Sequence, residues 1–117
     1  PVAISDLTTV EMRCLLARRR REKNIDSRME MQIWATFQED IRQNSLICYP
    51  LPADLAAGAI NLLSVLSDLP LRTLDAFHLV IAREIQSDIV ATADRIMAAG
   101  ARALGFSVVG FDKTGVR

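Results

Sequence analysis

Two acidic residues separated by one helix and one strand constrain this chain most. Asp75 opens an apolar helical pattern, and Asp94 follows a β-branched run. A helix over about residues 73–86 rises roughly 20 Å at about 1.5 Å per residue. A strand over about residues 88–92 returns roughly 16 Å at about 3.3 Å per residue. Because these two paths nearly cancel, we expect both carboxylates to lie at one edge of a sheet.

Short apolar runs alternate with helical patterns along the whole chain. Strands are predicted over residues 2–5, 46–49, 89–91 and 108–111. Helices are predicted over about residues 9–23, 27–41, 53–66, 73–86 and 95–104, and an irregular tail over 112–117. Asn24 is expected to end the first helix, and Ser27 with Glu30 fits a capping box at the start of the second. Strands separated by helices are typical of a parallel sheet covered on both faces. The pattern therefore predicts an α/β fold with three layers, α/β/α, in which the first strand is buried.

Size and composition fit a single globular domain. The chain has 117 residues, and its 14 Lys and Arg balance its 14 Asp and Glu, so net charge does not select a partner. Cys14 and Cys48 stand apart without a nearby His, which argues against zinc and for reduced core residues. No apolar run reaches the roughly 20 residues that span a bilayer, and no signal peptide is evident. We expect a cytoplasmic protein with no membrane partner.

A third acid, Glu11, follows the first predicted strand. If that strand lies parallel to the run before Asp94, the carboxylates of Glu11, Asp75 and Asp94 meet beyond the carboxyl ends of the strands, where such sheets bind ligands. Three close carboxylates repel one another unless a cation intervenes. Oxygen ligands without Cys or His favour Mg²⁺ or Mn²⁺, which suits phosphodiester hydrolysis. Thr92 and, with weaker support, Ser5 could orient a carboxylate or a water.

Each of these residues also has a purely structural interpretation. Glu11 could complete a capping box with Thr8, Asp75 could complement a helix N-terminus, and Asp94 could be an N-cap. His78 fits a packed core or boundary histidine better than a ligand. Thr92 is also an ordinary strand residue. Taken singly, each structural reading has at least even odds, and the predicted meeting at one edge favours a site.

Basic residues offer two possible contacts for nucleic acid. Arg72 and Arg95 flank the two later acids, where they could hold a phosphate backbone or pair with nearby carboxylates. The run Arg18–Arg21 could contact phosphates, but it fits the solvated end of a helix better. A group of Met29, Met31 and Trp34 fits core or dimer packing.

The sequence resembles the PIN domain, specifically the VapC-type toxins of toxin–antitoxin pairs, over nearly its whole length. The matching segments are Ile4–Glu11, Leu71–Leu79, Val90–Arg95, Ala101–Phe106 and Val108–Val109. The L-x-x-x-D-A-x-H-L and T-A-D-R motifs, in this order, carry the resemblance together. It implies a metal-dependent endoribonuclease of α/β/α architecture with Mg²⁺ or Mn²⁺ as cofactor. Its partners would be an RNA substrate, an antitoxin protein and a second copy in a homodimer.

The resemblance assigns roles to four residues. Glu11, Asp75 and Asp94 match acidic positions that hold the metal, and Thr92 matches a frequent polar position of the same site. The family pattern begins with a central strand carrying an Asp and a helix, neither of which precedes Val2 here. We therefore expect a single PIN-like domain over 1–117 that is N-terminally incomplete, as a fragment, a chain completed by another chain, or an inactive remnant.

Two other functions remain open. A non-catalytic PIN-like module would bind an antitoxin or RNA without cutting it. An ordinary α/β interaction domain would use its acids as helix caps. Loss of metal binding in Asp75→Asn and Asp94→Asn would distinguish the nuclease from both.

Overall fold

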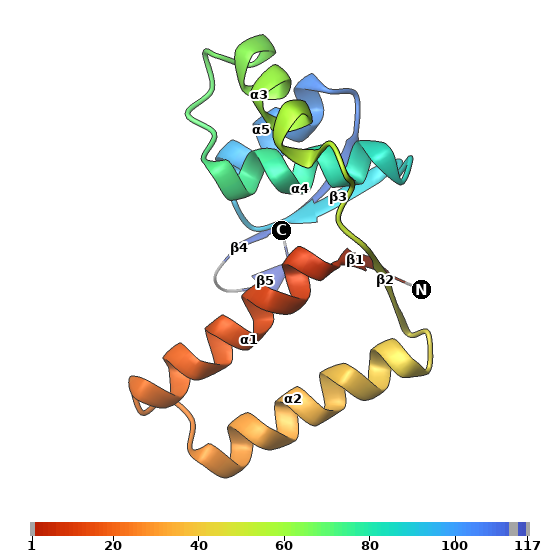
Figure 1. Ribbon diagram of the computed structural model, residues 1–117. Coiled ribbons are helices and arrows are strands. Elements are labelled where there is room, and N and C mark those ends of the chain that lie inside the picture. Colours follow the sequence, from red (N-terminus) through yellow and green to blue (C-terminus); the bar gives the residue numbers. More distant parts are fainter. Residues whose placement is uncertain (1, 113–114, 117) are drawn as a thin grey trace. The chain divides into compact units, whose positions relative to one another are not determined.

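The chain is a small mixed α/β protein that divides into two compact units (Figure 1). The computed structural model describes residues 2–112 and 115–116. The N-terminal unit is Pro1–Leu51 and the C-terminal unit is Pro52–Arg117, and each is described here by itself. The described residues form five helices and five short strands, as follows: β1 (Val2–Ser5), α1 (Asp6–Arg21), α2 (Ser27–Arg42), β2 (Leu46–Tyr49), α3 (Leu55–Val65), α4 (Thr73–Glu84), β3 (Ile89–Thr92), α5 (Arg95–Ala103), β4 (Ser107–Asp112) and β5 (Gly115–Val116).

Each unit contains one pair of parallel strands joined through helices. In the N-terminal unit β1 pairs with β2, from Val2 opposite Leu46 to Ser5 opposite Tyr49. In the C-terminal unit β3 pairs in parallel with β4, and β4 pairs antiparallel with β5. The predicted alternation of strands and helices is thus confirmed. The prediction of an irregular tail is wrong for three residues, because Asp112 ends β4 and Gly115 and Val116 form β5. Residues 113, 114 and 117 lie outside the described part.

Helix α1 begins earlier than the sequence predicted. Ser5 is 3% exposed, and its Oγ accepts a hydrogen bond of 3.2 Å from the backbone N–H of Leu7. This extended residue is the N-cap, so α1 starts at Asp6 and the predicted capping box of Thr8 and Glu11 is wrong. The first strand is also less buried than predicted, since Val2 is 62% exposed.

The turn between α1 and α2 differs from its prediction in two details. Lys23, not Asn24, adopts the left-handed conformation after α1, with φ of 63°. Asp26, not Ser27, caps α2, because its Oδ1 accepts the N–H of Met29 at 2.8 Å. The second predicted capping box is therefore wrong, and the Glu30 side chain is available for other partners.

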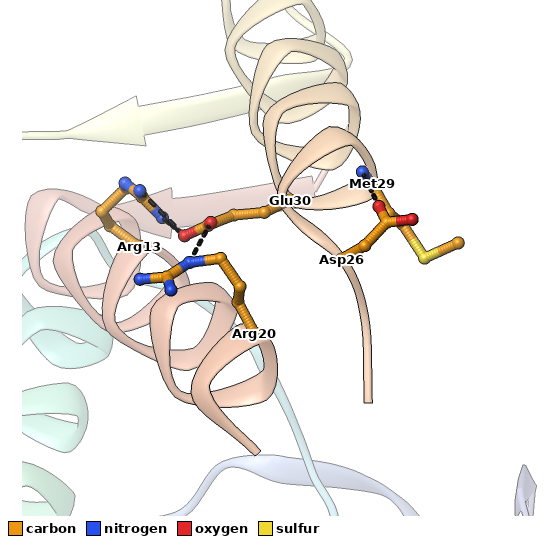
Figure 2. Close-up of polar contacts among 5 residues, drawn as sticks. All are labelled: Arg13, Arg20, Asp26, Met29 and Glu30. Atoms are coloured by element: carbon orange, nitrogen blue, oxygen red, sulfur yellow. Dashed lines mark hydrogen bonds and ion pairs between the residues drawn. The ribbon is translucent and has the colours of Figure 1, made fainter. Parts of the chain in front are cut away.

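A buried carboxylate joins the two helices of the N-terminal unit (Figure 2). Glu30 of α2 is 6% exposed, and both its oxygens accept hydrogen bonds from α1. Arg13 donates from Nη1 and Nη2 to Oε2, each at 3.0 Å, and Arg20 donates from Nε to Oε1 at 2.6 Å. Burial raises the pKa of Glu30, but the hydrogen bonds and charges of the two arginines outweigh it and hold that pKa below 4.5. Removing one partner of such a network leaves the others unpaired.

Aromatic contacts extend this network along α2. The Arg13 guanidinium lies 5.5 Å from the centre of the Trp34 ring, a cation–π distance. Trp34 in turn stacks on Phe37 with ring centres 5.7 Å apart. Met29 and Met31 are exposed, so core packing is wrong for both, and the alternative of dimer packing stays a prediction.

The C-terminal unit has the larger core. Its buried cluster draws on α3, α4, β3 and α5 and consists of Ala59, Leu62, Ala76, Leu79, Val80, Val90, Met97 and Ala101. Small residues let the helices approach closely: a Cβ atom on Gly100 of α5 would lie 3.0 Å from Cδ1 of Leu79. In the described part of the chain, no helix has the length and apolar character needed to cross a membrane.

Lowering the pH should weaken the link at Glu30. Because its folded-state pKa is depressed, its contribution to stability is present above 4.5 and disappears as the pH falls through the folded pKa. We expect Glu30→Gln to lower the free energy of unfolding at neutral pH, and the difference from the wild type to shrink as the pH falls below 4.5. Urea titrations across this range measure it. Glu39→Gln, which removes the exposed partner of Arg42, is the control; equal losses in both variants would contradict a special role for Glu30.

Adding one methyl group at Gly100 should destabilise the C-terminal unit. Gly→Ala in a helix normally gains up to about 1 kcal/mol. Here the new Cβ would lie 3.0 Å from Cδ1 of Leu79, and Leu79 is fully buried, so its side chain has little room to shift. Overpacking of this kind costs about 1–3 kcal/mol. We expect Gly100→Ala to lose about 1 kcal/mol net in urea unfolding. A stabilised variant would show that the packing at this contact is loose.

Candidate functional site

Asp75 is held by the first turn of α4. It is the third residue of the helix, and its Oδ2 accepts a hydrogen bond of 3.0 Å from the backbone N–H of Arg72. This bond pairs one backbone donor at the amino end of α4, as acids at this position commonly do. The Asp75 side chain is partly buried. Its position is therefore fixed by the helix and not by a charged partner.

Asp94 is held by the first turn of α5. Its Oδ1 accepts the backbone N–H groups of Ile96 at 2.8 Å and Met97 at 3.0 Å. The predicted N-cap role of Asp94 is thus confirmed. Thr92, the last residue of β3, accepts the Asp94 N–H on its Oγ1 at 3.0 Å. Thr92 therefore contacts the backbone of Asp94, and its suggested role of orienting a carboxylate or a water stays a prediction.

Each carboxylate commits one oxygen to its helix and leaves the other available. In residues 2–112, no hydrogen bond within the chain reaches Oδ1 of Asp75 or Oδ2 of Asp94. Both oxygens reach solvent, because no buried side-chain oxygen or nitrogen among the described residues lacks a hydrogen-bond partner. Helix capping and ligand binding are thus compatible, and the structural reading of each acid does not exclude a site.

The two helix ends that carry these acids lie at the same end of the C-terminal unit. Figure 1 shows β3 running back towards the end at which α4 begins, and α5 starting there. Helices α4 and α5 also pack together, with Leu71, just before α4, close to Gly100 of α5. This arrangement follows from the near-equal lengths of helix and strand that the sequence predicted.

Glu11 lies in the other unit. It is a partly buried residue of α1, and the structure describes the two units separately. Its meeting with Asp75 and Asp94 therefore stays a prediction. Over the described residues, no group of three His, Cys, Asp or Glu side chains is arranged to hold a metal ion.

The donor set of the C-terminal unit nevertheless suits a hard cation. Mg²⁺ commonly binds through one or two carboxylates and completes its shell with waters and substrate phosphates. The available oxygens of Asp75 and Asp94 are of this kind, and the C-terminal unit contains no cysteine. Asp75 and Asp94 are the residues that would hold Mg²⁺ or Mn²⁺, and Glu11 would be a third ligand if the units bring it there.

Two arginines flank the acids and remain open to solvent. Arg72 is the N-cap of α4 and Arg95 is the first residue of α5, and both are exposed. Neither forms an ion pair with any described residue. The alternative prediction for Arg72 and Arg95, that they pair with nearby carboxylates, is therefore wrong among the described residues. His78 is partly buried on α4, in line with a boundary histidine.

Cys48 is not a candidate nucleophile. Its Sγ donates to Oδ1 of Asp6 at 3.3 Å and lies 3.6 Å from Oγ1 of Thr9. Burial is the main cause and raises the pKa of this thiol. The hydrogen bond with Thr9 lowers it in part, and the hydrogen bond and charge of Asp6 raise it further. A thiol with a raised pKa stays protonated and inert at neutral pH. Both cysteines are free, but Cys14 is exposed, so the predicted core position is wrong for Cys14.

Comparison with known proteins adds no assignment. The chain matches no protein-family model, no curated protein and no solved structure. The function therefore has to be argued from the residues and their geometry.

Two substitutions at Asp94 should separate its structural role from any ligand role. Ala removes the acceptor for two backbone donors, and lost caps cost about 1 kcal/mol. Asn caps helices about as well as Asp, so Asp94→Asn should leave the free energy of unfolding almost unchanged while removing the charge. Urea unfolding of both variants measures this. An equal loss in the two variants would mean that the charge, not the cap, stabilises α5.

Proposed function

We propose that this chain belongs to a metal-dependent endoribonuclease of the PIN type, the toxin of a toxin–antitoxin pair. One observation carries the proposal: Asp75 and Asp94 each keep one carboxylate oxygen available at the same end of the C-terminal unit. Ligands of open α/β sheets bind beyond the carboxyl ends of the strands, which is where Asp94 follows β3.

The proposed complete site has three carboxylates. Asp75 and Asp94 would hold Mg²⁺ or Mn²⁺ from the C-terminal unit, and Glu11 would approach from the first helix of the N-terminal unit. When bound, such an ion supplies Lewis-acid activation of water and positive charge opposite the phosphodiester. The protein's own part is to keep both Asp side chains fixed through backbone amides, so that little reorganisation is needed when substrate binds.

The proposal extends to architecture and partners. In it the chain has a three-layer α/β/α architecture with a mostly parallel sheet. Arg72 and Arg95 are exposed beside the acids, and they would contact the RNA backbone. An antitoxin, a homodimer and a cytoplasmic setting follow from the proposed class and belong to the same proposal.

A second candidate is a PIN-like module that binds RNA or an antitoxin without cutting. The observation in its favour is that no three metal-ligand side chains come together among the described residues. Such a module would bind RNA equally well with and without Mn²⁺.

A cleavage assay with matched variants tests the proposal. We expect the full-length parent protein to cut single-stranded RNA with Mn²⁺ and to lose activity in EDTA. Asp75→Asn and Asp94→Asn should each lower the rate by roughly 100-fold or more, because each removes a charged ligand from a site that works by positioning and electrostatics.

Asp88→Asn is the control, since it removes an exposed acid from the same unit just before β3. It should keep the wild-type rate. Cleavage that persists in EDTA, or that falls equally in Asp88→Asn, would contradict the proposal. RNA binding without any cleavage would favour the second candidate.

A further inference from the structure

Positive charge is concentrated at the tip of the α1–α2 hairpin. Residues 18–28 hold six of the 14 Lys and Arg of the chain and two of its acids. We call the basic tip the five residues among these that are not bound to Glu30: Arg18, Arg19, Arg21, Lys23 and Arg28. All five side chains are exposed.

The charge of the basic tip is not neutralised within the described structure. Glu30 is the buried acid nearby, and Arg13 and Arg20 already occupy both its oxygens. Asp26 uses its Oδ1 to cap α2. Over residues 2–112, none of the five basic-tip side chains takes part in an ion pair.

The stability of the hairpin does not account for so many cations. A helix carboxyl end is equivalent to about half a negative charge, and its effect is confined to the last turn. Arg18, Arg19 and Arg21 share that turn with Arg20, and successive side chains there point about 100° apart around the axis. Like charges so close repel one another, and a polyanion would relieve that repulsion.

We propose that the basic tip binds the phosphate backbone of single-stranded RNA. The choice of RNA among polyanions rests on the proposed nuclease function, and the tip extends the substrate contacts beyond Arg72 and Arg95. Glu30 is a positioning residue in this scheme. It ties Arg13 and Arg20 of α1 to α2 (Figure 2) and so holds the hairpin in place. The basic-tip side chains are left exposed to solvent.

The test uses RNA binding in EDTA, so that neither metal nor cleavage contributes. Fluorescence anisotropy gives the affinity for a labelled single-stranded RNA of about 12 nucleotides over a range of salt concentrations. Each lost phosphate contact flattens the plot of log affinity against log salt by about 0.7. We expect the triple variant Arg18→Gln, Arg19→Gln and Arg21→Gln to flatten it by about 2.

The matched control removes the same charge elsewhere. Arg42→Gln, Arg83→Gln and Arg102→Gln neutralise three exposed arginines of α2, α4 and α5 and should keep the wild-type slope. Equal slopes for the two triple variants would mean diffuse attraction by overall charge, and would overturn the proposal. An unchanged slope together with a lower urea midpoint in the tip variant would mean that these arginines only stabilise the carboxyl end of α1. That result would also overturn the proposal.

This result is independent of the nuclease test. A chain that binds RNA through the basic tip in EDTA but never cleaves it would refute the proposed function alone. If the wild type cleaves RNA with Mn²⁺ and the tip variant shows the same salt dependence of RNA affinity as the wild type, only the proposed role of the basic tip would be refuted.

Discussion

Unpaired backbone amides at helix amino ends are the constraint on which the candidate site depends. The first turn of a helix leaves N–H groups without partners inside the helix. Asp75 and Asp94 satisfy three of them, with one oxygen each. The same bonds fix the carboxylates in place and leave the second oxygen of each for a ligand. Helix capping and ligand binding, which looked like competing explanations in the sequence, are therefore compatible in one arrangement.

In the N-terminal unit, the polar group that needs partners is a buried carboxylate, and arginine side chains supply them. Glu30 is buried between α1 and α2, where an unpaired carboxylate would be costly, and Arg13 and Arg20 bind it fully. Trp34 covers one face of the Arg13 guanidinium. Because Glu30 already binds Arg13 and Arg20 with both oxygens, it is not available to the five basic-tip residues, which form no ion pair among the described residues. The fold itself therefore produces an exposed basic surface.

Periodicity and local capping rules predicted much of the structure, and long-range pairing did not follow from them. The alternation of strand and helix and the N-cap at Asp94 came from local signals of the kind that single residues carry. Ser5 was overlooked as the cap of α1 because Thr8 and Glu11 imitate a capping box three residues later. Glu30 was assigned to such a box too, since its partners Arg13 and Arg20 lie on another helix. The meeting of Glu11 with the two Asp residues depends on how the units combine, which no local signal encodes.

Locating Mn²⁺ in crystals of the full-length protein is the most direct test of the central claim. The ion can be identified from its anomalous scattering. The account predicts one ion in contact with both Oδ1 of Asp75 and Oδ2 of Asp94, at about 2.1 Å as hard cations require, with a Glu11 oxygen beside it. Saturating Mn²⁺ with no ion at these oxygens, or with the two carboxylates on separate ions far apart, would contradict it.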